Sequence, residues 1–473
     1  MKRLLCLALL LTPFVGHATV HHVPSVHPTI QAGINAASPD DTVLVACGTY
    51  YESDILMKRG IVLLSETGLA DCAVIDAEGQ GQVMICLDLD PTPTRVKGFT
   101  FTHGYTAEHG GGVDCRNSTV IFEDCAFTEN EALIRGGGMH CLDSAAIVIR
   151  CLFSNNTAGW GGGLLCRLES RPRIRECGFR GNVATNNGGG LYFGGLPDME
   201  GEVSGSTFLS NTAVLQGGGI AFNDSSPLVT ECLIANNDAG AGGGVWCVNV
   251  QSRPVLRNCT ISHNSGYLPG AVYCNAGSRI SLENSIISFS SNGQAFHCAD
   301  GSIATLSCCN IYGNDDGDWE GCIGSQFGVN GNIAEDPLFC DAEAGDFSLC
   351  ADSPCAPEID GECGLIGALG VGCQNCAPPA SAPEAAAGVF HLNTGPNPFR
   401  GSTTFSFMLP SADRVLLEVF DVSGRRVTSL LDRTLEAGSH RVDFTPDARA
   451  GGVYFGRLRT TTFEARQTVI LVE

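Results

Sequence analysis

Residues 136–164 read GGGMHCLDSAAIVIRCLFSNNTAGWGGGL, and this unit returns along the chain from residue 110 to residue 314. Each copy opens with a glycine triplet and takes about 26 residues. The triplets begin at Gly110, Gly136, Gly161, Gly188, Gly217 and Gly242, and weaker copies stand at Pro269-Gly270-Ala271 and Gly293-Gln294-Ala295. An apolar residue follows each copy: Val113, Met139, Leu164, Leu191, Ile220, Val245, Val272 and Phe296.

The second half of the unit follows the pattern Φ-x-x-C-x-F-x-x-N, in which Φ is apolar. Its asparagines are Asn130, Asn156, Asn182, Asn211, Asn237, Asn264 and Asn314. A repeat of this length predicts a solenoid, and short β-rich runs between Gly and Asn turns indicate strands. The sequence therefore predicts an all-β fold, a parallel β-helix with about three short strands per rung. We expect the asparagines to adopt the left-handed conformation and to stack in an amide ladder.

The paired GGG-Φ and F-x-x-N motifs resemble the repeats of chlamydial polymorphic outer-membrane proteins. More broadly they resemble right-handed β-helix proteins of the pectin-lyase-like class, over roughly residues 25–375. The resemblance implies a right-handed coil. It is weak for activity, because this fold carries many functions.

The composition of the chain disfavours some classes of binding partner. The chain has 473 residues, 60 of them glycine, and a formal net charge of −23. Such acidity argues against a nucleic-acid partner, which would require basic stripes. It also disfavours anionic polyuronates such as pectate or alginate as ligands.

Residues 1–18 have the features of a secretory signal peptide. Lys2 and Arg3 form a basic start, residues 4–15 an apolar core, and Gly16-His17-Ala18 a small-x-small cleavage site. No later apolar run reaches membrane length, so we expect no transmembrane segment in the mature chain. These features predict export to the exterior or outer surface of a Gram-negative-type bacterium.

Of the 24 cysteines, Cys6 lies in the expected signal peptide, twelve lie in the repeat and eleven lie outside its columns. Twelve occupy two fixed columns of the repeat: Cys115, Cys141, Cys166, Cys247, Cys274, Cys298, and Cys125, Cys151, Cys177, Cys232, Cys259, Cys309. Phe or Ser replaces Cys on some rungs, which favours buried thiols; disulfides between rungs and a metal ladder remain alternatives. Outside the columns, the disulfide candidates are Cys47, Cys72, Cys340, Cys350, Cys355 and Cys363, and we expect Cys47 to pair with Cys72.

The segments that flank the repeat suggest caps. Pro28 suits a first helical position, and Ile30, Ile34 and Ala37 then share one face of a short helix that would cover the first rung. We expect strands over residues 42–46, 61–65, 73–76 and 84–87. Residues 336–339 and 345–347 resemble the closing rung of bacterial β-helix proteins.

The C-terminal part of the chain does not follow the repeat pattern. Residues 377–388 are rich in Pro and Ala and predict a linker. Residues 389–473 predict a small β-sandwich, with strands at 403–409, 415–422, 440–444, 452–459 and 467–472. Its motifs Pro396-Asn397-Pro398-Phe399, Asp421-x-x-Gly424-Arg425 and Gly452-Val453-Tyr454 resemble the sorting domain of type IX secretion and the Ig-like domain of flagellar hook-assembly proteins. That resemblance implies a role in export or surface attachment, with the secretion machinery as partner.

Two stretches are candidates for binding chemistry. The acidic run of Asp315, Asp316, Asp318 and Glu320 resembles a cation loop, but Trp319 replaces the glycine of a calcium hand, so a solvated turn is favoured. The second is the row between the inward residues of the post-triplet strand: Asp114, His140, Leu165, Tyr192, Ala221, Trp246, Tyr273 and His297. Exposed, its rings at His140, Tyr192, Trp246, Tyr273 and His297 would suit sugar stacking or protein docking; the alternative is a row covered by a neighbouring segment.

The residues of a lyase or a hydrolase are not evident in the repeat. No lysine follows Gly110 within the solenoid, and acids do not occupy adjacent rungs of one outward column. The sequence therefore favours a non-catalytic scaffold, an adhesin or glycan-binding protein without a cofactor, whose partner is an extended glycan or a surface protein. The alternative is a polysaccharide lyase or glycoside hydrolase.

Overall fold

The computed structural model describes residues 18–374, except 93, 200, 269 and 358–362, and residues 392–395, 399–409, 412–421, 425–435, 438–446, 452–460 and 464–471. The expected signal sequence up to residue 17, the linker at 377–388 and Pro396-Asn397-Pro398 lie outside the described residues. The chain forms two compact units, Met1–Cys376 and Ala377–Glu473.

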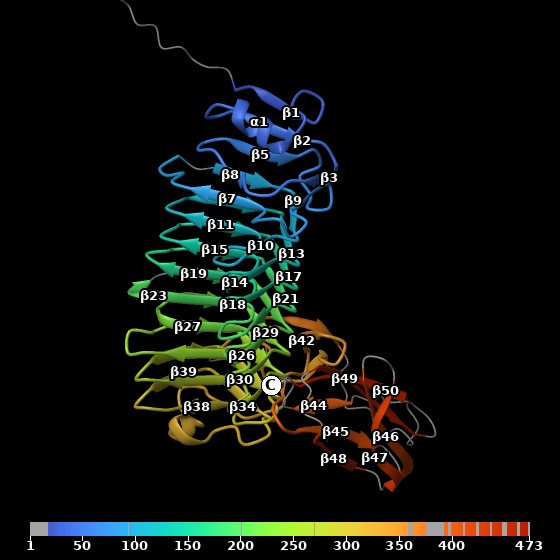
Figure 1. The fold of residues 1–473 in the computed structure, drawn as a ribbon. Coiled ribbons are helices and arrows are strands. Elements are labelled where there is room, and N and C mark those ends of the chain that lie inside the picture. Colours follow the sequence, from blue (N-terminus) through green and yellow to red (C-terminus); the bar gives the residue numbers. More distant parts are fainter. Residues whose placement is uncertain are drawn as a thin grey trace, which may run out of the picture. The chain divides into compact units, whose positions relative to one another are not determined.

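The first unit is a coil of parallel strands (Figure 1). Sheet A contains β1 (Val20–Val23), β2 (Thr42–Val45), β5 (Val62–Ser65), β8 (Thr94–Lys97), β12 (Val120–Glu123), β16 (Ile147–Ile149), β20 (Arg173–Arg175), β24 (Glu202–Ser204), β28 (Leu228–Thr230), β32 (Val255–Arg257), β36 (Arg279–Glu283) and β39 (Ile303–Ser307). Sheet B contains β3 (Gly48–Tyr51), β6 (Ala73–Asp76), β9 (Phe99–Thr102), β13 (Ala126–Thr128), β17 (Leu152–Ser154), β21 (Gly178–Arg180), β25 (Thr207–Leu209), β29 (Leu233–Ala235), β33 (Thr260–Ser262), β37 (Ile286–Ser288) and β40 (Asn310–Tyr312).

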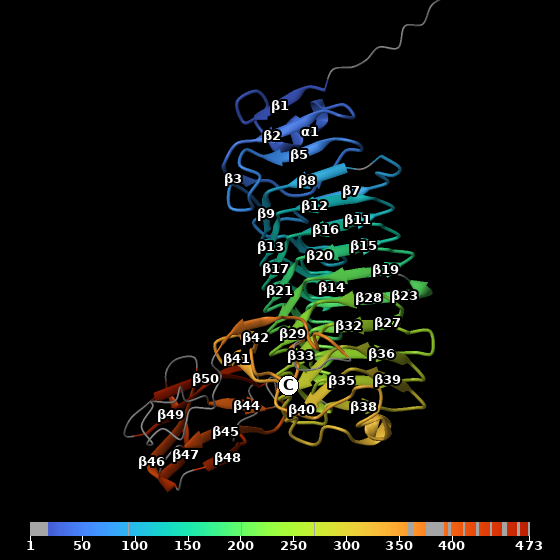
Figure 2. The ribbon, with the colours of Figure 1, turned by 180° about the vertical axis from the view of Figure 1, so that it is seen from behind.

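Two further sheets complete each rung. Sheet C contains β4 (Ile55–Leu56), β7 (Met84–Leu87), β11 (Val113–Arg116), β15 (Met139–Leu142), β19 (Leu164–Leu168), β23 (Leu191–Met199), β27 (Ile220–Ser225), β31 (Val245–Val248), β35 (Val272–Asn275) and β38 (Phe296–Cys298). Sheet D contains β10 (Tyr105–Thr106), β14 (Glu131–Arg135), β18 (Thr157–Trp160), β22 (Val183–Ala184), β26 (Thr212–Gln216), β30 (Asp238–Ala241) and β34 (Ser265–Leu268). Figure 2 shows the stack of sheet A from behind.

The parallel β-helix is confirmed, but a middle rung has four strands where the sequence predicts three. The chain visits sheets A, B, D and C in turn and then begins the next rung. Equivalent residues stack in register, and the rings of Phe127, Phe153, Phe179 and Phe208 lie 4.5–4.8 Å apart and nearly parallel. The sequence does not predict sheet D, because its strands are short and carry few apolar residues that face the core.

The asparagine ladder forms as predicted. Asn182 Nδ2 donates to Asn211 Oδ1 at 2.9 Å and to the Phe153 carbonyl at 2.9 Å, and Asn182 Oδ1 accepts from the backbone N–H and Nδ2 of Asn156. The expected left-handed conformation falls one residue earlier, as at Asn155 with φ 55° and Ser210 with φ 56°. The preceding residue makes the corner, which turns the ladder side chain inward.

The triplets are glycine because the chain leaving sheet D crosses closely over sheet C. A Cβ on Gly161, where φ is +63°, would lie 2.7 Å from Leu165 Cβ. A Cβ on Gly162 would lie 2.5 Å from the Val183 carbonyl oxygen and 2.6 Å from that of Gly189. Such separations are below contact distance, so larger residues cannot occupy these positions without moving the next rung.

The two cysteine columns have different environments. In sheet C, the thiols of Cys115, Cys141 and Cys166 are fully buried in the core, and Phe193 and Phe222 continue their column. At the corner between sheets A and B, each thiol donates to a carbonyl two residues earlier, as Cys125 does to Glu123 at 3.2 Å. Ser206 makes the same bond at 3.0 Å, which explains why Ser replaces Cys there.

The N-terminal cap is confirmed. Helix α1 (Ile30–Ala36) begins after Thr29, two residues beyond Pro28, and buries Ile30 and Ile34 against the first rung. The Glu52 carboxylate accepts the N–H groups of Ile30 at 2.7 Å and Gln31 at 3.0 Å, so this helix start has its acceptor. The expected strands at 42–46, 61–65, 73–76 and 84–87 appear as β2, β5, β6 and β7 within one residue at each end.

The C-terminal end of the coil differs from the prediction. The 3₁₀ helix η1 (Gly321–Gln326) closes the core through the fully buried Ile323. Residues 336–339 and 345–347 were expected in a closing rung, but this region instead forms the antiparallel pair β41 (Phe339–Asp341) and β42 (Asp346–Cys350), joined by β43 (Val371–Cys373). Phe347 packs on the outer face of sheet B against Leu233 and Ala235, because those outward positions are apolar.

The second unit is a small β-sandwich, as predicted. One sheet contains β44 (Asn393–Gly395), β45 (Thr403–Leu409) and β48 (Gly438–Phe444); the other contains β47 (Arg426–Leu435), β46 (Asp413–Asp421), β49 (Gly452–Arg459) and β50 (Glu464–Leu471). A core that includes Phe405, Val419 and Leu458 lies between them. Strand β47 was not predicted, because its many charged and polar side chains hide the alternation.

Candidate functional site

The predicted binding row lies mostly inside the protein. Asp114, His140, Leu165, Tyr192, Ala221 and Trp246 are buried, so the exposed stripe proposed for His140, Tyr192 and Trp246 is wrong and the alternative of a covered row holds for them. The cover is the chain that returns from sheet D, since the first glycine of each triplet lies directly on the outward side chain of sheet C. Only the end of the row opens, where Tyr273 is half-buried and His297 is exposed, with ring centroids 5.8 Å apart.

The covered rings form a small core of their own. Tyr192 and Trp246 pack with Leu165, Ala221 and Val248. The Tyr192 hydroxyl accepts a hydrogen bond from Asn223 Nδ2 at 2.8 Å, and Trp246 Nε1 donates to Asn275 Oδ1 at 3.1 Å. Their polar atoms are therefore already paired, and the two rings join successive strands of sheet C.

A polar cluster occupies the N-terminal end of the row. The Asp114 carboxylate lies 2.8 Å from His140 Nδ1 and 2.5 Å from Arg116 Nη2. Burial opposes its ionisation, but the hydrogen bonds from His140 and Arg116 outweigh this and lower the pKa of Asp114. Burial and the neighbouring His140 and Arg135 lower the pKa of His109. Asp114 thereby joins two neighbouring strands of sheet C, since His140 lies on β15 and Asp114 and Arg116 lie on β11.

Carboxylates of the acidic turn after Asn314 accept hydrogen bonds from backbone N–H groups. The Asp318 carboxylate accepts the N–H groups of Gly313 at 3.0 Å and Asn314 at 2.9 Å, and Asp315 accepts that of Asn292 at 3.2 Å. Within the described part of the chain, no three His, Cys, Asp or Glu side chains converge as a metal site. The carboxylates of Asp315 and Asp318 thus bind backbone N–H groups of the turn and of the preceding corner.

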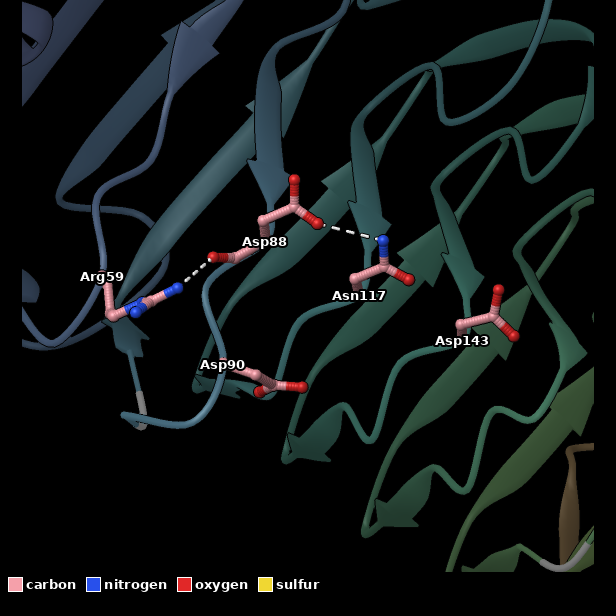
Figure 3. Close-up of a pocket in the computed structure, with 5 residues that line it drawn as sticks. All are labelled: Arg59, Asp88, Asp90, Asn117 and Asp143. Atoms are coloured by element: carbon pink, nitrogen blue, oxygen red, sulfur yellow. Dashed lines mark hydrogen bonds between the residues drawn. The ribbon is translucent and has the colours of Figure 1, made fainter.

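Two open acidic depressions lie on the N-terminal half of the coil, and sequence reasoning missed both. The first, with a volume of 320 Å³, is lined by Arg59, Asp88, Asp90, Asn117 and Asp143. These residues come from corners that follow successive strands of sheet C (Figure 3). Arg59 donates to the Asp88 carbonyl at 2.8 Å and Asn117 Nδ2 to the Asp88 carboxylate at 3.0 Å, which fixes the acidic rim.

The second depression is larger, 610 Å³, and contains a titratable group among carboxylates. Its lining residues are Asp76, Glu78, Gly79, His103, Gly104, Tyr105, Glu129 and Glu131, from three successive rungs at the corner of sheets B and D. His103 Nδ1 lies 3.0 Å from Asp76 Oδ1 and His103 Nε2 lies 3.1 Å from Glu129 Oε2. The imidazole thus bridges two carboxylates, one on each of the two rungs that flank its own.

The electrostatics of this second depression favour positive charge. Burial of His103 opposes its protonation, but the hydrogen bonds and charges of Asp76 and Glu129 prevail and raise its pKa. His103 and Glu129 occupy the left-handed corner, with φ of 51° and 56°. The corner precedes the ladder position, so reading that one column down the repeat would have found both residues.

One comparison with known proteins bears on the coil. Residues 85–240 and 176–311 match the family model of the right handed beta helix region. This chain is a right-handed parallel β-helix protein of the pectin-lyase-like kind. No curated protein matches it. Within this β-helix, His103 and Glu129 fall inside the matched region, whereas Asp76 precedes it.

Disulfides reinforce both ends of the β-helix. The predicted pair Cys47–Cys72 is confirmed, and three further bridges join pairs of described cysteines: Cys298–Cys322, Cys308–Cys363 and Cys340–Cys373. Cys350 is also disulfide-bonded, as expected. Two assignments were wrong: Cys298 leaves its thiol column because Cys322 of η1 lies beside it, and Cys355 is a buried thiol, 3.1 Å from Asn310 Nδ2. No helix of the described residues has the length and apolarity to cross a membrane.

Proposed function

We propose that this protein is an exported or surface-displayed, non-catalytic β-helix scaffold that binds an extended ligand, a neutral or cationic glycan, at the depression around His103. The observation that carries the proposal is the imidazole held between Asp76 and Glu129, 3.0 and 3.1 Å from their oxygens, in an open hollow of 610 Å³. An exposed Tyr105 ring lies on its rim. Carboxylates that accept hydroxyl or ammonium hydrogens beside an aromatic ring make a suitable surface for a sugar chain.

The charge of the chain supports this choice of ligand. A net charge of −23 repels polyuronates, attracts cationic chains and does not oppose the approach of neutral ones. The acidic residues of the hollow lie on strands or corners of a rigid stack, held by the asparagine ladder and the stacked phenylalanines, so the site is positioned before binding. A preorganised site loses little conformational entropy when an extended ligand docks.

The same hollow also supports a second candidate, a glycoside hydrolase. Such enzymes place two carboxyl groups about 5–10 Å apart, one on each side of the scissile bond. Asp76 and Glu129 flank one imidazole, which brings two carboxylates into a single open site. The distinction between binding and cleavage therefore depends on what happens to a bound chain.

A glycan panel separates the two functions. The purified protein is incubated with neutral, aminated and uronate polysaccharides, and retention and new reducing ends are both measured. Retention of a neutral or aminated chain without cleavage, lost in the double variant Asp76→Asn with Glu129→Gln, supports the scaffold. New reducing ends that vanish in that variant would establish the hydrolase. Glu202→Gln, an acid of sheet A paired with Arg175, is the matched control.

Export through the C-terminal sandwich is the second part of the proposal. The disulfides of the coil suit an oxidising compartment, and the sandwich carries the motifs that resemble sorting domains. We expect a chain lacking residues 389–473 to be retained in the cell envelope. The surface variant Arg414→Ala, which keeps the sandwich, should be exported as the intact protein is. Equal extracellular yield of the truncated chain would refute this role.

A further inference from the structure

The start of the first rung brings two histidines together. Strand β1 and helix α1 are joined by a tight turn, in which the His22 carbonyl accepts the N–H groups of Val26 and His27, each at 3.0 Å. This turn folds His27 back beside His21. As a result His21 Nδ1 lies 3.2 Å from His27 Nε2, and the ring centroids are 5.3 Å apart. His22 is exposed on the other face of the strand, because side chains alternate.

Asp41 fixes the orientation of His21. Its carboxylate accepts the N–H groups of Ser38 at 2.8 Å and Thr19 at 2.6 Å, and its Oδ2 lies 3.2 Å from His21 Nε2. Because this carboxylate already accepts two backbone N–H groups, it acts as an acceptor toward His21 as well. His21 Nε2 then carries the proton, and His21 Nδ1 offers its lone pair toward His27.

The distance between the two nitrogens suits a metal ion. Two imidazoles bound tetrahedrally at about 2.0–2.1 Å place their nitrogens about 3.3 Å apart, close to the 3.2 Å between His21 Nδ1 and His27 Nε2. In the tautomer of His27 that has its proton on Nδ1, the two facing nitrogens, His21 Nδ1 and His27 Nε2, both carry a lone pair. A ligand histidine whose other nitrogen donates to a carboxylate is the usual arrangement at protein metal centres, and Asp41 supplies that carboxylate.

We propose that His21 and His27 bind a divalent transition-metal ion of the kind that prefers imidazole, Zn²⁺ or Cu²⁺, with Asp41 as the positioning residue of His21. The two side chains are half-buried, which leaves the outer coordination positions to water or to a ligand. The site lies on the cap of the first rung, so the ion would join β1 to the start of α1. This inference is independent of the glycan-binding proposal.

Calorimetric titration of the full chain with Zn²⁺ tests the site. We expect saturable binding of one ion that Ca²⁺ and Mg²⁺ do not reproduce, weakened at least tenfold by His27→Ala and by His21→Ala. His22→Ala, one residue away on the exposed face, is the matched control and should bind as the wild type does. A far-UV spectrum of each variant shows whether the coil is intact, and His27→Gln gives a second substitution if His27→Ala is unfolded.

Two further readouts separate this site from other metal binding. Cu²⁺ bound as proposed gives an electron paramagnetic resonance spectrum with two imidazole nitrogens, and Asp41→Asn lowers affinity about 10–100-fold without changing that number. A chain cleaved after Ala18 would begin Thr19-Val20-His21 and could hold Cu²⁺ through its amine and amides alone. Undiminished Cu²⁺ or Zn²⁺ affinity in His27→Ala, or equal loss in His22→Ala, would overturn the proposal.

Discussion

The asparagine ladder gives the sharpest test of how the coil is held together, through the substitution Asn182→Ala. Asn182 is fully buried, and its side chain takes part in four hydrogen bonds with Asn156, Asn211 and the Phe153 carbonyl. Alanine leaves the backbone N–H of Asn156 buried without its acceptor. A buried donor that loses its partner costs about 1–3 kcal/mol, and each other lost bond about 1 kcal/mol.

The expected loss in free energy of unfolding is therefore about 4–6 kcal/mol. Urea unfolding followed by far-UV circular dichroism would measure it as a lower midpoint of the coil's transition. Asn186→Ala is the matched control, because this half-buried side chain lies four residues beyond the ladder position. Asn182→Asp should cost at least as much, since it removes both donors and buries a charge. A loss for Asn182→Ala no larger than that for Asn186→Ala would show that the ladder contributes nothing and that the stacked rings alone hold the coil.

Three further predictions follow from the same structure. Gly162→Ala should unfold or shift the neighbouring rung, seen as a large fall in thermal midpoint, because its Cβ would lie 2.5 Å from a carbonyl oxygen; Gly370→Ala, with nothing within 4 Å, should be neutral. Thiol titration of the unfolded, unreduced protein should find at least twelve free thiols, which are Cys86 and the column cysteines other than Cys298. A thiol content near zero would show that the columns are oxidised. Nuclear magnetic resonance should give His103 a pKa above 6.5, and this pKa should fall in the variant Asp76→Asn with Glu129→Gln. The charged pairing stabilises the fold fully below about pH 6.5, and this stabilisation is lost as the pH rises through the raised pKa. An unchanged pKa in the variant would refute the pairing.

The coil also explains why the polar residues of the corners tell more about function than its aromatic residues do. Stacking at each inward position repeats the same contact, so Phe, Cys and Asn serve the rung whatever the ligand is. The left-handed corner residues project outward and vary from rung to rung. His103 and Glu129 are two such corners, and their side chains meet because they occupy neighbouring rungs.

The sequence alone determined the parallel coil, its register, the asparagine ladder, the N-terminal cap, the Cys47–Cys72 bridge and the C-terminal sandwich. The coil, its register and the ladder follow from contacts that recur at a fixed spacing, such as Asn156 with Asn182, so a pattern in one dimension predicts them. The cap, the bridge and the sandwich follow from local signals in their own segments. Only the tertiary structure decided which of the outward-facing side chains are buried. Trp246 alternates with inward residues and was expected outside, but the return of the chain from sheet D buries it. Pairs such as Asp76 with His103 and His21 with His27 likewise depend on corners and turns whose direction no local pattern fixes, because the approach of side chains across rungs is a property of the folded backbone.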